Sequence, residues 1–120
     1  MTFTIEIVLR NTEDAVVEQV DYEGHEPHLW TEADVREILT RILLAIDRAK
    51  NPEGPRPPVS LRGFSWIVEP LEPGATDRVV IALEIPMGAA VAGPFAIEQR
   101  TLDRLIGRVL ASGSGSGAVH

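Results

Sequence analysis

An amphipathic pattern over residues 32–50 constrains this chain most strongly. Thr31 is a favourable N-cap residue, and Asp34, three positions later, can complete a capping box with it. After the cap, apolar residues recur at spacings of three and four, which predicts a helix with one wide buried face. These residues are Val35, Ile38, Leu39, Ile42, Leu43, Ile46 and Ala49. Asn51-Pro52 ends the pattern, so this helix must bury its apolar face against other elements.

Period-two alternation before the helix predicts a β-hairpin. Within residues 2–10, one face of the chain is apolar through Phe3, Ile5, Ile7 and Leu9. Turn residues follow at positions 11–14, and residues 15–22 are expected to return as the second strand.

Two further strands and a second helix are expected after residue 58. Residues 59–69 predict a third strand and residues 78–85 a fourth. The fourth has a continuously apolar centre, Val79–Leu83, which is typical of a strand in the middle of a sheet. A second apolar stripe predicts a helix over residues 95–111.

These elements predict an α+β two-layer sandwich, with a four-stranded, mainly antiparallel sheet and both helices on one face. The domain is expected to span residues 1–111, in two ββα halves, 1–50 and 59–111. A Pro-rich linker, residues 51–58, would join the halves, and residues 112–120 form a flexible Gly/Ser tail. The two helical stripes align apolar for apolar, which either an internal duplication or the shared demands of two core-facing helices would explain.

Composition excludes several classes of protein. The chain has 120 residues, no cysteine and a net charge of −7, so it can be neither a disulfide scaffold nor a thiolate metal site. Nine of its acidic residues and only one arginine lie within residues 1–34. Such an acidic chain is a poor partner for nucleic acid, whose binding depends on Lys and Arg. No secretory signal or membrane span is visible, and we expect a cytoplasmic protein.

Residues 62–68, Arg-Gly-Phe-Ser-Trp-Ile-Val, resemble the RNP1 segment of the RNA-recognition motif family. The resemblance implies that Phe64 and Trp66 would stack on RNA bases. It covers this short segment alone, and Glu69 stands where that family has its last aromatic. The expected element order also differs from that family's, and the alternation of Phe64, Trp66 and Val68 equally fits the core face of a strand.

A group of carboxylates and imidazoles lies at the end of the predicted hairpin. Asp21, Glu23 and His25 would share one face if the strand continued to residue 25, and His28 follows in a short loop. Carboxylate and imidazole ligands suit zinc, manganese or iron. The spacing matches no established metal motif, and a solvated acidic strand end explains the same residues, so no metal or other cofactor is assigned.

The segment Pro86–Phe95 is uncharged, rich in glycine and alanine, and long for a strand-to-helix connection. We expect such an apolar loop to be covered rather than fully exposed to solvent. Three explanations are open: the segment covers the core, it forms an interface through Met87, Val91 and Phe95, or it is a flap over a ligand.

Arg100, Arg104 and Arg108 recur at every fourth residue and line one face of the second predicted helix. Local pairing with Glu98 and Asp103 would make this an ordinary solvated face. Alternatively, the arginines could bind the acidic N-terminal third of a second copy.

The sequence therefore favours an acidic, non-enzymatic interaction or assembly module. Its partner would be another copy of itself, as a homodimer or larger species, or a different protein. The contacts would use the 87–95 segment, the arginine face, or exposed sheet and helix surfaces. The alternative is a small metal-dependent enzyme or ligand-binding protein with its site around residues 21–28.

Overall fold

The first helix, α1 (Glu32–Lys50), begins at the capping box that the sequence predicts. The Thr31 side chain accepts a hydrogen bond from the Asp34 backbone N–H, and the Asp34 carboxylate accepts one from the Thr31 N–H. The apolar stripe of α1 is buried from Val35 to Ile46. These features come from a computed structural model, which describes residues 1–10, 12–54, 60–86 and 88–112.

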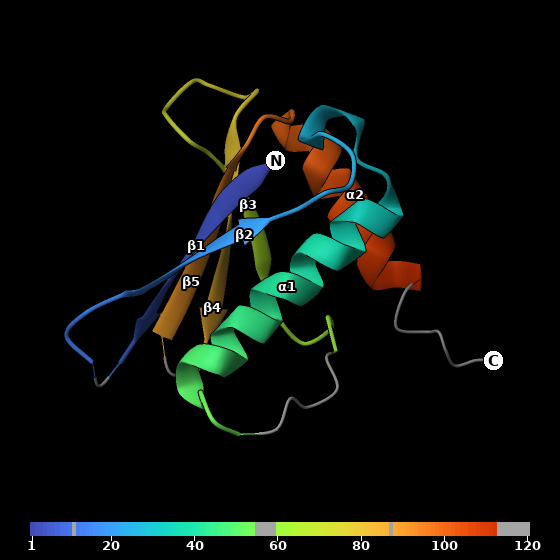
Figure 1. The fold of residues 1–120 in the computed structure, drawn as a ribbon. Helices are drawn as coiled ribbons and strands as arrows, with labels where there is room; N and C mark the ends of the chain where they lie inside the picture. Colours follow the sequence, from blue (N-terminus) through green and yellow to red (C-terminus); the bar gives the residue numbers. More distant parts are fainter. Residues whose placement is uncertain (11, 55–59, 87, 113–120) are drawn as a thin grey trace.

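One antiparallel sheet forms the second layer of this α+β fold (Figure 1). Its strands are β1 (Thr2–Leu9), β2 (Val16–Asp21), β3 (Trp66–Pro70), β4 (Val79–Ile85) and β5 (Gly88–Phe95), in the spatial order β2-β1-β5-β4-β3. The hairpin of β1 and β2 confirms the N-terminal prediction. The second helix, α2 (Gln99–Ser112), follows β5 directly. A single 3-10 turn, Pro27–Leu29, lies between β2 and α1.

The prediction of four strands in a ββα–ββα order is wrong, because the apolar segment before α2 is itself a strand. β5 lies at the centre of the sheet and pairs with β1 on one side and β4 on the other. The observed order is therefore ββαβββα, and the two halves do not repeat one another. The third strand is also shorter than predicted, since β3 begins only at Trp66. Residues 55–59 and 113–120, part of the predicted linker and tail, lie outside the described residues.

Glycine, alanine and proline disfavour strands, so the sequence of β5 does not predict one. The structure shows how Gly88 and Pro94 fit into this strand. A Cβ on Gly88, whose φ is +156°, would lie 1.8 Å from the Val8 carbonyl oxygen. Pro94 sits at a bulge, where the register with β4 shifts between Val79 and Ile81, and a bulge is a position where a strand tolerates proline.

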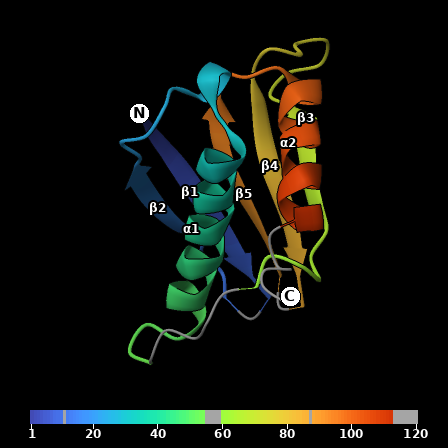
Figure 2. The same cartoon turned by 90° about the vertical axis from the view of Figure 1, so that its right-hand side faces the viewer.

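Both helices pack on the same face of the sheet (Figures 1 and 2). The core between the layers contains a chain of aromatic rings. Phe3 of β1 contacts Phe95 at a centroid distance of 5.0 Å, and Phe95 contacts Trp30 at 5.1 Å. Trp30 meets Tyr22 edge-to-face at 6.4 Å. This chain of rings ties the end of β5 to the loop that leads into α1.

Candidate binding surface

The sheet face that points away from the helices carries exposed apolar side chains. The strand register aligns one row across the five strands on this face: Val17, Glu6, Val91, Ala82 and Ile67. Val17 is 61% exposed, Ile67 44% and Val91 39%, and Val8 in the neighbouring row is 51% exposed. We call the outward residues of the five strands the open face.

The open face is unusual for an uncovered antiparallel sheet, in which outward side chains are commonly polar. In β4 both faces are apolar as far as Leu83, since Val80 and Ala82 point outward between the buried Val79, Ile81 and Leu83; Glu84 is the next outward residue. Such a pattern is typical of strands covered on both sides. Of the elements that the structure describes, both helices cover the inner face of the sheet and neither covers the open face (Figures 1 and 2).

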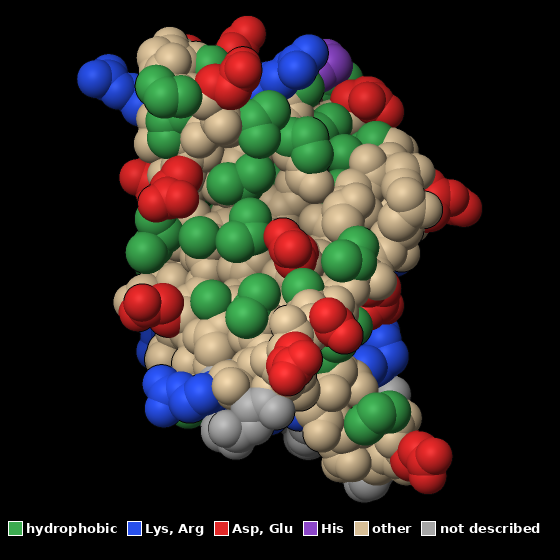
Figure 3. Space-filling model, turned by 90° about the vertical axis from the view of Figure 1, so that its left-hand side faces the viewer, with side chains coloured by type: hydrophobic (Ala, Val, Ile, Leu, Met, Phe, Trp, Pro, Cys, Tyr) green, Lys and Arg blue, Asp and Glu red, His purple; other side chains and the backbone are tan. Residues whose placement is uncertain are grey.

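The charged groups of the open face are all acidic. Among the described strand residues, the register places Glu6, Glu69, Glu84 and Asp21 there, and no Lys or Arg. In Figure 3, apolar side chains occupy the middle of this face, acidic ones lie among and beside them, and basic ones lie at its margins. Glu6, Glu69 and Glu84 form no ion pair with any residue in the described part of the chain.

The described residues predicted to form an interface lie in three different parts of the structure: the open face, the core and α2. Val91 lies on the open face, whereas Phe95 is fully buried in the aromatic core. Arg100, Arg104 and Arg108 are exposed on α2, which lies on the opposite side of the sheet. Arg108 pairs with Glu32 of α1, with 3.9 Å between Nη1 and Oε2. Met87 lies outside the described residues.

The predicted metal-site residues do not converge. β2 ends at Asp21, so the shared face of Asp21, Glu23 and His25 does not form, and Asp21 lies at the end of the open face. His28 is exposed in the 3-10 turn. Across residues 1–10, 12–54, 60–86 and 88–112, no three His, Asp or Glu side chains are arranged to hold a metal ion.

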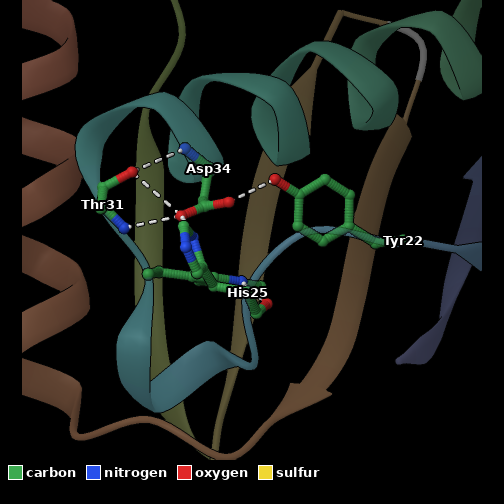
Figure 4. A network of polar contacts seen from close by, with 5 residues as sticks. Tyr22, His25, Thr31 and Asp34 are labelled. Atoms are coloured by element: carbon green, nitrogen blue, oxygen red, sulfur yellow. Dashed lines mark hydrogen bonds and ion pairs between the residues drawn. The ribbon is translucent and has the colours of Figure 1, made fainter.

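His25 instead joins a polar network around the buried Asp34 (Figure 4). The Tyr22 hydroxyl donates to Asp34 Oδ1 at 2.5 Å, and His25 Nδ1 lies 2.7 Å from Oδ2. The Thr31 hydroxyl and backbone N–H both donate to Oδ2, each at 2.9 Å. The sequence identified Asp34 as a capping residue, but the partnership with Tyr22 and His25 depends on the path of the loop between β2 and α1.

The network shifts the pKa values of two side chains, Asp34 and Tyr22. Burial opposes ionisation of Asp34, but the hydrogen bonds it accepts outweigh burial, those from Tyr22 and Thr31 above all, and hold its pKa well below the usual range. Burial raises the pKa of Tyr22 to about 12, and the hydrogen bond and negative charge of Asp34 act in the same direction. Both carboxylate oxygens are occupied by partners of the same chain, so this network is a structural anchor for the start of α1.

A groove of about 360 Å³ runs between β2 and α1, with Arg41 and Arg48 among its lining residues. Arg41 donates to Glu37 and to the Asp21 carbonyl oxygen, and Arg48 pairs with Glu18. Its arginines are thus occupied within the chain.

The aromatic residues of the RNP1-like segment pack against the hydrophobic core. Trp66 and Val68 face the helices and are buried, and Trp66 Nε1 donates to the Leu61 carbonyl oxygen at 2.9 Å. The half-buried Phe64 packs edge-on against Trp66, with 6.1 Å between ring centroids. The residues that β3 exposes on the open face are Ile67 and Glu69, neither of which is aromatic.

Within the described residues, no helix is sufficiently long and apolar to span a bilayer. Comparison of the chain with protein-family models, with curated proteins and with solved structures finds no match.

Proposed function

We propose that this protein is an interaction module and that the open face is its docking surface. The observation that carries the proposal is that β4 and β5 carry apolar residues outward as well as inward, Val80, Ala82 and Val91 among them, and that the described helices cover only the inner face. Burying apolar surface is the main driving force of protein association, and an exposed contiguous apolar surface marks such sites. The sequence-based expectation of a homo-oligomer stays a prediction.

Site-specific photo-crosslinking tests this proposal, because the chain has no native cysteine to interfere. Single cysteines replace Val91 or Ile67 on the open face, and each carries a thiol-linked photo-crosslinker. Glu72→Cys, in the turn after β3, serves as the matched control. Arg104→Cys reports on the exposed side of α2.

We expect a discrete adduct from both open-face positions in extract of the native cells and none from residue 72. Adding Val91→Glu to the Ile67→Cys protein should abolish that adduct, because a carboxylate would enter the apolar contact. Equal yields from all positions, an adduct from residue 104 alone, or no adduct would overturn the proposal. An adduct of twice the chain mass, also formed by the purified protein, would identify the partner as a second copy.

A further inference from the structure

The distribution of charge on the open face indicates what kind of partner it can accept; this step rests on the function proposed above. Glu6 lies in β1 opposite Val91, and Glu84 lies in β4 opposite Ala89. Glu69 lies in β3 opposite Val80. All three are exposed and border the apolar side chains of β4 and β5. A partner that covers those side chains must therefore also desolvate or meet these carboxylates.

A second copy of the open face is a poor partner by this criterion. A two-fold contact between two open faces would bring carboxylates against carboxylates. The described residues of the five strands include no Lys or Arg that could neutralise them. Removing unpaired carboxylates from water is costly, and like charges across an interface repel. A second copy could instead offer the exposed side of α2, which carries arginines. The exposed apolar residues of that side are small, such as Ala111, and would cover the valines of the open face poorly.

The spacing of the acidic residues suits a helix. Glu6 and Glu69 stand on β1 and β3, with β5 and β4 between them. Three strand spacings separate these two strands by roughly 14 Å. An α-helix with its side chains is about 10 Å across, so one helix can lie over β5 and β4 with a carboxylate on either side. The inner face of the same sheet already packs against two helices.

We propose that the open face binds an amphipathic helix of another protein, whose apolar stripe is flanked on both sides by Lys or Arg. Leu, Val or Ala of the stripe would cover Val91, Ala82 and Val80. The flanking cations would reach Glu6 on one side and Glu69 on the other, in charge-assisted contacts. Glu84 follows Ala82 on the outward face of β4, so a further Lys or Arg at that end of the helix would meet it. Apolar burial supplies the affinity, and the two rows of charge set the orientation of the helix.

Two designed peptides of about 18 residues, or five helical turns, test this proposal with the intact protein. Both have the same Leu/Ala stripe; one has Lys at every flanking position and the other has Glu. Each carries a fluorophore, and anisotropy measures its binding. We expect the Lys peptide to bind at least about tenfold more tightly than the Glu peptide, and added salt to reduce this difference.

Charge reversal on the protein gives the decisive comparison. Glu6→Lys/Glu69→Lys should weaken the Lys peptide and strengthen the Glu peptide, so that the preference inverts. Glu53→Lys/Glu72→Lys makes the same change in net charge at exposed positions outside the strands and should leave both affinities unchanged. Val91→Glu should weaken both peptides.

The proposal is overturned if the two peptides bind alike, if neither binds, or if both double variants act alike. A face-specific crosslink to another protein, combined with failure of both peptides, would leave the docking surface in place and reject the basic helix as its occupant. A crosslink to a second copy would reject it as well. Loss of the face-specific crosslink itself would reject the proposed function.

Discussion

The hydroxyl of Tyr22 donates a 2.5 Å hydrogen bond to Asp34 Oδ1 and so joins the end of the hairpin to the first turn of α1. Both side chains are buried, and no buried side-chain nitrogen or oxygen of the described residues lacks a hydrogen-bond partner. The contact links two elements that the sequence predicts separately, and it makes the capping residue of α1 part of the tertiary core.

Replacing Asp34 with Ala should lower the free energy of unfolding by about 2–4 kcal/mol. Loss of an N-terminal cap costs about 1 kcal/mol, and the buried Tyr22 hydroxyl would lose its acceptor, at about 1–3 kcal/mol. Urea denaturation of Asp34→Ala, Tyr22→Phe and the double variant measures the coupling, expected at about 1–2 kcal/mol. Additive effects of the two substitutions would contradict a direct interaction.

Tyr22 should ionise only in strongly alkaline solution. It is the one tyrosine of the chain, so the near-ultraviolet absorbance of tyrosinate reports its titration alone. The folded protein should show a pKa of about 12, and Asp34→Asn should lower it by removing the adjacent negative charge. Because the folded-state pKa exceeds the ordinary value of 10.0, the associated stability is intact below pH 10 and is lost as the pH rises towards 12. A wild-type titration near the ordinary value would contradict the network.

Asp34 should make the protein sensitive to acid. Its folded-state pKa lies below the ordinary value of 3.8, so its contribution to stability is complete above that value and declines as the pH falls further. The difference in unfolding free energy between wild type and Asp34→Asn should therefore shrink from about pH 4 to about pH 2. Chemical denaturation at a series of pH values measures it, and a constant difference would show that Asp34 carries no such linkage.

Val91 and Phe95 lie in the same strand but should respond very differently to substitution. Phe95→Ala removes a fully buried ring and should cost about 3–5 kcal/mol. Val91→Glu places a charge on an exposed surface, and the isolated protein should stay folded, with a loss of about 1 kcal/mol or less. Thermal unfolding of both variants tests this contrast, and unfolding of Val91→Glu would show that the open face is covered within the chain.

Two glycines offer a matched test of the sheet register. Gly88→Ala would force a Cβ against the Val8 carbonyl oxygen at a positive φ and should cost about 2 kcal/mol or more. A Cβ on Gly107 in α2 would have no described atom within 4 Å apart from the neighbouring backbone of its own helix. Gly107→Ala should therefore stabilise the protein by about 0.5–1 kcal/mol. Equal effects in urea denaturation would contradict the pairing of β1 with β5.

Local signals account for much of the fold. The Thr31–Asp34 capping box, the stripe of α1, the N-terminal hairpin and β4 each follow from neighbouring residues, and the structure confirms them. Their periodicity also predicted the α+β class. β5 has no such local signal, since its Gly, Ala and Pro residues disfavour a strand. It becomes one because β1 and β4 supply hydrogen-bonding partners on both sides.

The candidate surface depended more on the tertiary structure. The sequence identified Val91 and the continuous apolar pattern of β4, and it identified Asp34 as a cap. It could not show that Val91 and Phe95 of one segment face opposite sides of a sheet, because that requires the strand and its register. The sequence did predict both helices on one face, and the structure places them there. The five-strand order and its register, which the sequence did not predict, decide that Val17, Val91 and Ile67 point to the uncovered face. Local sequence determines which segments are amphipathic, but only the packing of the layers determines which apolar face is left without a cover.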